Sequence, residues 1–287
     1  MSVYNYLNKE SVLSLIKLAL LEDIGDGDHT SLASIPADKI NSSKLIVKDE
    51  GILAGVESAK WVCEAVDSNL IFNELISDGS NVKYGDIAFT VEGNSRSILA
   101  AERLLLNIMQ RMSGIATYTN FLVQKVAHTN VRLLDTRKTT PNFRIFEKWA
   151  VQIGGGVNHR FGLFDMILLK DNHVDVAGGI FNALTNTKNY LERTGLKLDI
   201  EIEVRNIQEL SQVVEFGGVK RIMFDNMAVQ EICKGLEIIN GQFETEISGG
   251  VSEETIVQLA ETGVDYISIG KLTHSIRSLD LSLKAIK

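Results

Sequence analysis

The sequence predicts an α/β protein in which a barrel-like series of βα units follows a mixed α+β region. The first observation is a set of six short apolar runs that end in a polar residue or glycine: VRLLDTRK, DMILLKDNH, LDIEIEVR, RIMFDNM, FETEISGG and YISIGKLT. The second is that helical stretches follow these runs, an alternation typical of a parallel sheet covered on both faces. The third is that Glu203, Asp225, Ile247 and Ile269 recur about every 22 residues, the size of a compact βα unit.

The first third of the chain has a different pattern. We predict a helix over residues 10–22, strands within 42–56 and 86–99, and a helix over 57–66 between them. Residues 97–124 carry apolar side chains at helical spacing, which predicts a long helix joining the two regions. The 287 residues, 45% of them hydrophobic, suffice for one barrel-sized domain and a smaller one.

The composition argues against nucleic acid or a membrane as the main partner. The formal net charge is −8 and the pI is about 5.3, whereas duplex binding usually requires a basic excess. The apolar stretch SVLSLIKLALL is preceded by Glu10 and interrupted by Lys17, which predicts an amphipathic helix and not a signal peptide. No other segment approaches the length of a membrane span. Cys63 and Cys233 lie far apart without metal-ligand spacing, which indicates a reducing, cytoplasmic location.

Polar residues follow each of the six apolar runs. In a βα barrel the catalytic groups come from the carboxyl ends of several strands. The residues at these ends are Arg137 and Lys138, Lys170, Glu203, Asp225, Ser248 with Gly249 and Gly250, and Gly270. The cations come from the early strands and the carboxylates from the later ones. Because ionised donors bind phosphate and carboxylate strongly and with defined geometry, we expect a shared cavity that binds a polyanion.

Each of these residues also has an ordinary structural interpretation. Arg137 and Lys138 suit a solvated edge, Lys170 suits a side chain that extends to solvent, and Glu203 and Asp225 suit helix caps. The glycines suit plain strand-to-helix turns. The coincidence of all these residues at one end of successive strands favours a functional site over these separate explanations.

The stretch GGGVNHRFG, residues 154–162, extends the set of anion-binding groups. Three consecutive glycines are unfavourable in helices and strands, and they indicate close approach of the backbone to a ligand or to another strand. His159 and Arg160 follow directly, although a flexible loop with these two residues is the simpler interpretation of the fragment alone. His173, just after a strand, suits a capping or packing role as well as a functional one.

Longer motifs extend over nearly the whole chain. They are ALLEDIGDGDHTS (19–31), EGILAG (50–55), AERLLLNIMQRMSGIAT (101–117), DTRKTTPNFRIFEKWAVQIGGGVNHRFGLFDMILLKDNH (135–173), EIEV, MFDNM, SGGV and GKLTHS. In these motifs the sequence resembles the quinolinate phosphoribosyltransferase family. The resemblance implies an N-terminal α/β sandwich domain over residues 1–112, joined by 274–287, and an incomplete βα barrel of fewer than eight strands over 113–273.

The resemblance also implies a reaction and an assembly. Quinolinate is joined to 5-phosphoribosyl 1-pyrophosphate with Mg²⁺, which releases pyrophosphate and carbon dioxide and gives nicotinate mononucleotide for NAD synthesis. Both substrates are anionic, which explains a cluster of cations. The family forms homodimers at least, and the partner's N-terminal domain supplies the arginine of the AER motif, here Arg103. Helical spacing alone places Arg103 on the surface of a helix.

The resemblance assigns roles to the residues at the strand ends. The assigned substrate-binding residues are Arg103, Arg137, His159 and Arg160 for quinolinate, Lys138 and Lys170 between the two substrates, Ser248, Gly249, Gly250 and Gly270 for the 5-phosphate, and also Thr136, Glu203 and Asp225. The residues expected to act in catalysis are Lys138, Lys170, Glu203 and Asp225. Glu203 and Asp225 suit the ribose hydroxyls or the Mg²⁺, and they stabilise the positive charge that develops on the ribose when pyrophosphate leaves.

Three features depart from the family's usual pattern. The segment between Lys170 and Glu203 is longer than in many members, and Ile247 stands where a small residue is common before SGG. Lys271 lies beside the expected phosphate loop, where it suits a phosphate contact and a solvent-facing position equally.

Three rival functions remain. Lys170 at a strand end also suits a Schiff-base aldolase, although nearby arginines favour anion binding over a neutral amine. The related protein encoded with molybdate transporters shares the fold, but the intact TRKTTP, NHR and LLKDNH motifs favour the quinolinate enzyme. A non-catalytic phosphosugar-binding protein is the third, and it gains nothing from Glu203 and Asp225 beside an anion.

Overall fold

The computed structural model describes residues 6–286, which form two compact units. The barrel unit consists of Leu122–Arg137 and Val157–Gly270. The sheet unit consists of the described residues of Asn5–Phe121 and Lys271–Lys287 together with Lys138–Gly156. The predicted boundary between residues 112 and 113 lies inside one long helix, α4 (Ser95–Lys125), whose last four residues belong to the barrel unit.

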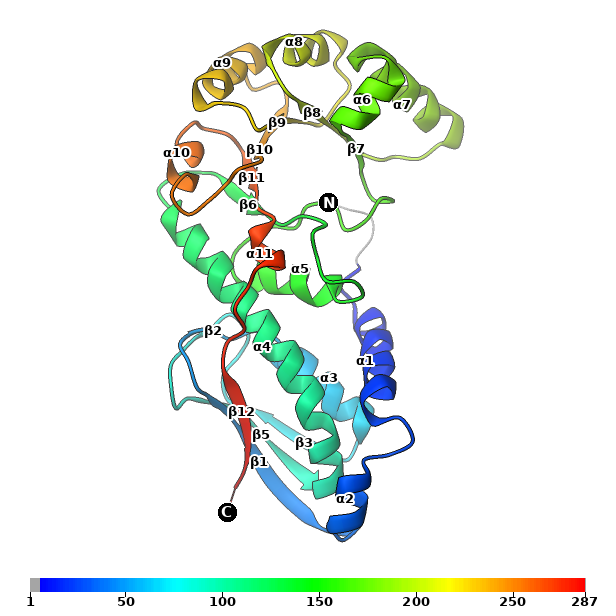
Figure 1. Cartoon of the computed structure of the whole chain (residues 1–287), viewed down its shortest axis with the longest axis vertical. Helices are drawn as coiled ribbons and strands as arrows, with labels where there is room; N and C mark the ends of the chain where they lie inside the picture. Colours follow the sequence, from blue (N-terminus) through cyan, green and yellow to red (C-terminus); the bar gives the residue numbers. More distant parts are fainter. Residues whose placement is uncertain (1–5, 287) are drawn as a thin grey trace. The chain divides into compact units, whose positions relative to one another are not determined.

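The described residues of the barrel unit contain one six-stranded parallel sheet (Figure 1). Its strands are β6 (Arg132–Leu134), β7 (Ile167–Leu169), β8 (Ile200–Val204), β9 (Arg221–Asp225), β10 (Glu244–Ser248) and β11 (Tyr266–Ser268), in the order β6-β11-β10-β9-β8-β7. All six apolar runs are therefore strands. The prediction of an incomplete barrel with fewer than eight strands is confirmed.

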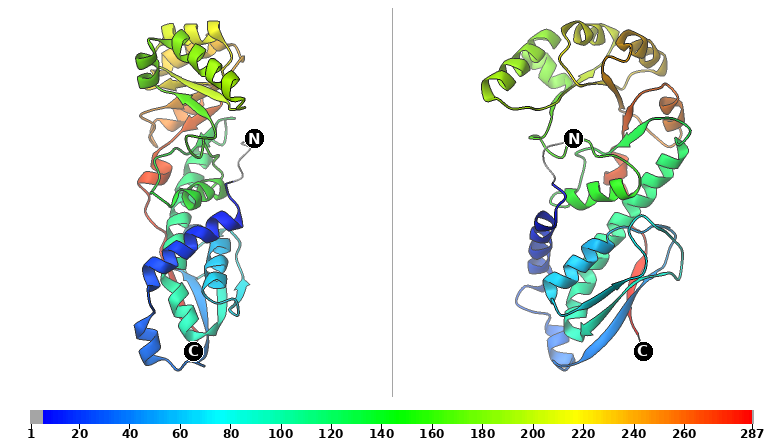
Figure 2. Two further views of the ribbon diagram at one scale, coloured as in Figure 1. Left: turned by 90° about the vertical axis from the view of Figure 1, so that its right-hand side faces the viewer. Right: turned by 180° about the vertical axis from the view of Figure 1, so that it is seen from behind.

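Helices connect these strands and cover their outer face (Figures 1 and 2). They are α6 (Asp171–Ala177), α7 (Ile180–Thr194), α8 (Ile207–Phe216), α9 (Val229–Ile239) and α10 (Ile256–Ala260). The long segment after Lys170 forms α6 and α7. His173 caps α6, because its Nδ1 accepts the Lys170 N–H at 2.9 Å, which supports the capping interpretation of this residue.

The sheet unit contains an antiparallel sheet in the order β12-β1-β5-β3 and a small β2-β4 pair. The strands are β1 (Ile40–Val47), β2 (Gly51–Ile52), β3 (Ile71–Glu74), β4 (Asn81–Val82), β5 (Ile87–Asn94) and β12 (Leu281–Ala285). The helices are α1 (Lys9–Ile24), α2 (His29–Ser34), α3 (Val56–Val66), α5 (Arg144–Ile153), α11 (Lys271–His274) and most of α4. The predicted N-terminal sandwich of helices and sheet is confirmed.

Helix α4 organises the core of the sheet unit. Its apolar stripe buries Leu105, Met109 and Met112 completely or nearly so, and the sheet contributes buried Leu45 and Phe89. Burial of such side chains contributes roughly 1.5–3 kcal/mol each. Within residues 6–286, no helix is long and apolar enough to cross a membrane.

Candidate active site

The carboxyl ends of the parallel strands bring the predicted carboxylates together. Glu203 is the fourth residue of β8 and Asp225 the last residue of β9, and these two strands are neighbours in the sheet. Asp225 is in register with Ser248, the last residue of β10. Glu203, Asp225 and Ser248 therefore end three adjacent strands at one edge of the sheet.

Lys170 belongs to the same edge. It follows β7 directly, and its Nζ lies 2.6 Å from Oε1 of Glu203, whose side chain is almost completely buried. Lys170 itself remains exposed, so its ammonium group connects the buried carboxylate to the surface of the barrel mouth.

Arg137 and Arg160 form the cationic part of the site. Burial, and after it the positive charge of Arg137, lowers the pKa of Arg160 below the usual value of a guanidinium. A bound carboxylate would offset the positive charge that Arg137 places near Arg160, since ionised donors pair strongly with carboxylates. Arg137 is exposed.

A buried aspartate holds the segment that carries Arg160. Asp135 is completely buried just after β6. Its two oxygens accept the backbone N–H of His159 at 2.9 Å and the side-chain amide of Asn158 at 2.6 Å. Asp135 therefore fixes the start of the NHR motif to the strand end that precedes Thr136 and Arg137.

The loop after Arg160 is closed by its own polar contacts. Oδ2 and Oδ1 of Asp165 accept the backbone N–H groups of Phe161 and Gly162 at 2.7 and 2.9 Å. The Arg160 Nη1 donates to the Met166 carbonyl at 3.2 Å. These bonds limit the directions that the Arg160 guanidinium can take.

The SGG motif after β10 has a backbone that requires glycine. Gly249 and Gly250 have φ values of 89° and 62°, in the left-handed region that disfavours side chains. A Cβ on Gly249 would lie 2.2 Å from Oδ1 of Asn226, whose backbone N–H donates to the Ser248 carbonyl. The motif, which comes directly after β10, therefore packs against the residue that follows β9. Gly270 stands just after β11 at the same edge of the sheet.

Lys271 makes an aromatic contact within the sheet unit. Its Nζ lies 5.4 Å from the centre of the Tyr118 ring, and both residues belong to the sheet unit. The sequence analysis considered a phosphate contact or a solvent-facing position for Lys271, and this cation–π contact is neither of the two.

The turn after Lys138 is held by a buried ion pair of the sheet unit. The Thr273 hydroxyl donates to the Lys138 carbonyl at 2.8 Å. Two oxygens of the fully buried Glu147 accept the N–H and the hydroxyl of Thr140 at 3.1 and 2.9 Å. Arg111 donates to the same carboxylate from Nε at 3.1 Å and from Nη2 at 2.9 Å. The main chain beside Lys138 is therefore fixed by Glu147 and Arg111.

Replacement of Glu147 by alanine should lower the free energy of unfolding by about 2–4 kcal/mol, because it removes the buried carboxylate that accepts from Thr140 and pairs with the partly exposed Arg111. Denaturant unfolding followed by circular dichroism measures this loss. The matched control is Glu64→Ala, which removes an exposed ion pair with Lys9 in the same unit and should cost roughly 0–1 kcal/mol. Equal losses for the two variants would contradict the structural role of Glu147.

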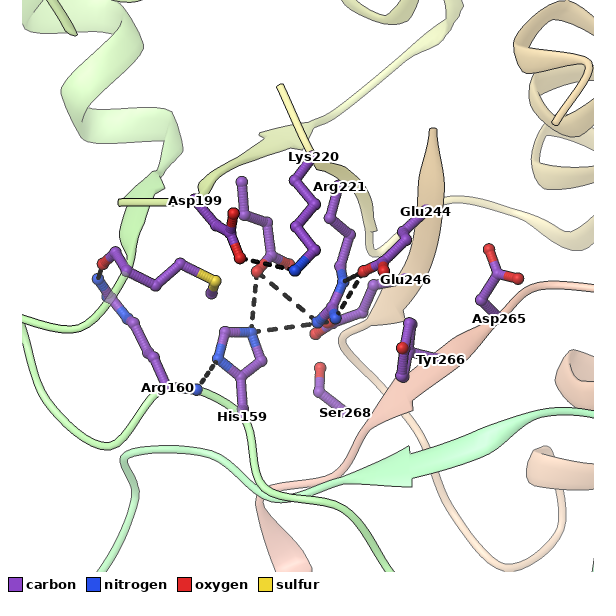
Figure 3. Close-up of polar contacts among 12 residues, drawn as sticks. His159, Arg160, Asp199, Lys220, Arg221, Glu244, Glu246, Asp265, Tyr266 and Ser268 are labelled. Atoms are coloured by element: carbon purple, nitrogen blue, oxygen red, sulfur yellow. Dashed lines mark hydrogen bonds and ion pairs between the residues drawn. The ribbon is translucent and has the colours of Figure 1, made fainter. Parts of the chain in front are cut away.

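A second cluster of charged residues lies inside the barrel, below the strand ends (Figure 3). Glu201 and Glu246 are completely buried, and the His159 Nε2 lies 3.1 Å from Oε2 of Glu201 and 3.6 Å from Oε2 of Glu246. The Arg221 Nη1 lies 2.9 Å from Oε2 of Glu246. The cluster was not predicted from the sequence.

The electrostatics of this cluster follow from its burial. Burial raises the pKa of Glu201 to about 7, although the charge of Arg221 opposes the shift. Burial, followed by the charge of Glu201, also raises the pKa of Glu246 to about 7. Burial opposes the charge of Arg221, but Glu201 and Glu246 outweigh it and the pKa of Arg221 is raised.

The sequence contains a signal for Glu201 and Glu246. Each stands two residues before a residue of the predicted site, Glu203 and Ser248 respectively, inside an apolar strand. The pleat of a strand places residues two apart on the same face. A charged residue two positions before a strand-end site residue therefore predicts a polar group inside the barrel.

Arg103 is assigned to the sheet unit, whereas Arg137 and Arg160 are assigned to the barrel unit. It is an exposed residue of α4 in the sheet unit. Within its own chain it belongs to a different unit from Arg137 and Arg160.

Comparison with known proteins identifies the family of the chain. Residues 28–113 match the N-terminal domain and residues 115–284 the C-terminal domain of quinolinate phosphoribosyl transferase. The chain belongs to the quinolinate phosphoribosyltransferase family. The family resemblance expected from the motifs is confirmed over nearly the whole chain.

Individual relatives and solved structures extend the match. The chloroplastic nicotinate-nucleotide pyrophosphorylase [carboxylating] of Arabidopsis thaliana is 45% identical over 94% of this chain and 82% of its own length. A probable nicotinate-nucleotide pyrophosphorylase of Bacillus subtilis is 37% identical over 96% and 94%. The nicotinate-nucleotide pyrophosphorylase structure from Francisella tularensis superposes with a TM-score of 0.90 at 39% identity, covering 98% of both chains.

Proposed function

We propose that the protein transfers the phosphoribosyl group of 5-phosphoribosyl 1-pyrophosphate to quinolinate, with release of pyrophosphate and carbon dioxide, to form nicotinate mononucleotide. Membership of the family supports this proposal. The observation that carries it is the gathering of Lys170, Glu203 and Asp225 at the carboxyl ends of neighbouring strands, in the unit that also carries Arg137 and Arg160. Such an arrangement suits an acceptor with two carboxylate groups.

Arg137 and Arg160 bind the quinolinate carboxylates in this proposal. A guanidinium donates two parallel hydrogen bonds to a carboxylate, which orients the ring as well as holding it. Thr136 precedes Arg137 at the same strand end. Lys170 contacts oxygens of both substrates, and Lys138, next to Arg137 in the chain, has the same assignment.

Glu203 and Asp225 act on the ribose. When pyrophosphate leaves C1, positive charge develops on the sugar, and two carboxylates at adjacent strand ends stabilise it. Their oxygens also suit Mg²⁺, which is usually held by one or two carboxylates together with substrate phosphates. Mg²⁺ bound there would neutralise negative charge on the pyrophosphate leaving group.

The remaining steps follow from the substrates. The ring nitrogen of quinolinate forms a bond to C1 as the bond to pyrophosphate breaks. The pyridinium then accepts the electron pair left when the adjacent carboxylate departs as carbon dioxide, and that carbon takes up a proton. Ser248, Gly249, Gly250 and Gly270 lie at the strand ends where backbone N–H groups suit the 5-phosphate.

The proposed assembly is a homodimer at least, in which Arg103 of each subunit contacts quinolinate bound to its partner. The exposure of Arg103 on α4 is compatible with this role.

The structure argues against a Schiff-base aldolase. A Schiff base requires lysine to attack a carbonyl carbon, whereas the Lys170 Nζ is engaged by Oε1 of Glu203 at 2.6 Å. The carboxylate therefore favours substrate binding by Lys170 over nucleophilic attack.

Nicotinate should be a poor acceptor. It lacks one of the two carboxylates, so that cations of the site would remain unpaired, and its kcat/KM should be lower than that of quinolinate by roughly 10³–10⁴. Steady-state kinetics with both acceptors at saturating 5-phosphoribosyl 1-pyrophosphate and Mg²⁺ measure the ratio. Comparable values for the two acceptors would rule out the assignment of the arginine pair to a dicarboxylate.

A further inference from the structure

His159 has neighbours at both ring nitrogens. The backbone N–H of Arg160 donates to Nδ1 at 2.7 Å. Nε2, on the opposite side of the ring, faces Oε2 of Glu201 at 3.1 Å and Oε2 of Glu246 at 3.6 Å. The side chain is nine-tenths buried, so these contacts are removed from solvent.

These contacts determine the tautomer of His159. A nitrogen that accepts an N–H bond cannot carry a hydrogen of its own, so Nδ1 is unprotonated. The single hydrogen of the neutral ring is therefore on Nε2, where it faces the two carboxylates. The imidazolium form, with hydrogens on both nitrogens, does not fit beside the Arg160 N–H.

A divalent cation is a poorer explanation of the same group. Ligand atoms of His159, Glu201 and Glu246 lie within 4.8 Å of one another, a spacing that could hold a metal ion. A metal on Nε2 would require the lone pair of that nitrogen, and the ring hydrogen would then stand on Nδ1 against the Arg160 N–H. Arg221 already supplies positive charge to Glu246 at 2.9 Å.

Of the two carboxylates, Glu246 is held by Arg221, which lies 3.9 Å from Oε2 of Glu201. Its guanidinium contacts Glu246 and also Glu244, from Nη2 at 2.9 Å, and stacks 4.0 Å from the centre of the Tyr266 ring. Figure 3 shows His159 facing this assembly from the loop on the opposite side. Glu201 of β8 and Glu246 of β10 thus face the imidazole, and Arg221 of β9 lies between Glu246 and Tyr266 of β11.

We propose that His159, Glu201, Glu246 and Arg221 form a brace that positions Arg160 for quinolinate binding. The brace holds the imidazole, and the imidazole accepts the N–H of Arg160. This contact fixes the main chain from which the Arg160 guanidinium extends toward the anion site. His159 is then a positioning residue that acts through Arg160 and does not itself need to bind a carboxylate.

The brace adds a second anchor to the one supplied by Asp135. Asp135 holds the N–H of His159, whereas the brace holds the N–H of the next residue through a side chain. A binding group must be held within a fraction of an ångström for full effect, which explains two anchors on adjacent peptide groups.

The test compares Glu201→Leu and Glu201→Gln with Glu244→Gln as the matched control. Glu244 contacts Arg221 but is not among the carboxylates beside His159. Loss of the polar group beside Nε2 in Glu201→Leu should raise the quinolinate KM about tenfold or more, with the KM for 5-phosphoribosyl 1-pyrophosphate changed less than about twofold. Glu201→Gln should recover much of the loss, because it keeps an oxygen of the same reach beside Nε2. Glu244→Gln should match the wild type.

Two outcomes of the kinetics would overturn the brace. One is an unchanged quinolinate KM in Glu201→Leu, and the other is an equal rise of both substrate constants, as general loosening of the barrel would give. The brace rests on the proposed function, since quinolinate is the substrate of that reaction. A second measurement is therefore chosen that does not depend on turnover. Histidine-selective ¹⁵N NMR of the wild-type protein should show His159 as the neutral Nε2–H tautomer.

The NMR measurement remains decisive if the leucine variant does not fold or if the wild type is inactive. An Nδ1–H tautomer or an imidazolium at His159 would contradict the brace, whatever the activity. Metal content is measured for the purified wild type and for Glu246→Gln. The wild type should contain no stoichiometric transition metal that is missing from the variant. A retained ion lost in that variant would replace the brace by a metal site.

Discussion

Replacement of Arg160 by alanine should lower kcat/KM for quinolinate about a hundredfold or more, a loss of roughly 3 kcal/mol of transition-state stabilisation. The change removes a half-buried guanidinium whose pKa is lowered by burial and by the charge of Arg137. Without it, one carboxylate of the substrate loses a charged partner and the ring loses its orientation. Steady-state kinetics with varied quinolinate measure the effect.

The control for this prediction is Arg193→Ala, which removes an exposed arginine on α7 of the same unit. Its kinetic constants should stay within about twofold of the wild type. Thermal unfolding should show both variants folded. Wild-type kinetics in a folded Arg160→Ala variant would exclude Arg160 from the site.

Mixing two inactive variants should restore activity if Arg103 acts across the subunit interface. Arg103→Ala and Lys138→Ala subunits carry different lesions, so a hybrid dimer contains one site with neither lesion. Random exchange makes about half of the dimers hybrids, each with one intact site of two, and should give about a quarter of wild-type activity. Activity is assayed after subunit exchange, which differently tagged subunits verify by co-purification.

The same experiment has an internal control. Mixing Lys138→Ala with a second variant that alters the same set of groups, Arg137→Ala, should give no recovery, because no hybrid site is then complete. If hybrid dimers are present and the first mixture recovers no activity, Arg103 does not act across the interface. It would then act in the site of its own subunit or lie outside the site.

Much of the barrel was predictable because each strand is a short apolar run with a polar end. The six runs, the repeat of about 22 residues and the long α4 are all patterns within a local window. Strands β3 and β12 were not predicted. β3 is only four residues long and mostly exposed, so it lacks a clear apolar alternation, and β12 gains its partner β1 from the other end of the chain.

The strand-end residues of the site were predictable for the same reason, since parallel strands bring their carboxyl ends to one edge. The residues that hold the site in place were not predicted. Asp135, Glu147 and Glu201 act on partners that are distant in sequence or on neighbouring backbone groups. Their contacts exist only after the chain has folded. In the sequence, a buried acid in a strand is marked only by its spacing of two residues from a strand-end site residue.

The central claim is the transfer of a phosphoribosyl group coupled to decarboxylation. The most direct measurement incubates the purified protein with 5-phosphoribosyl 1-pyrophosphate, Mg²⁺ and quinolinate labelled in the carboxyl group next to the ring nitrogen. The account predicts labelled carbon dioxide and nicotinate mononucleotide in equal amounts, and neither product when 5-phosphoribosyl 1-pyrophosphate is omitted. Folded protein that forms neither product, or that releases carbon dioxide without the mononucleotide, would contradict it.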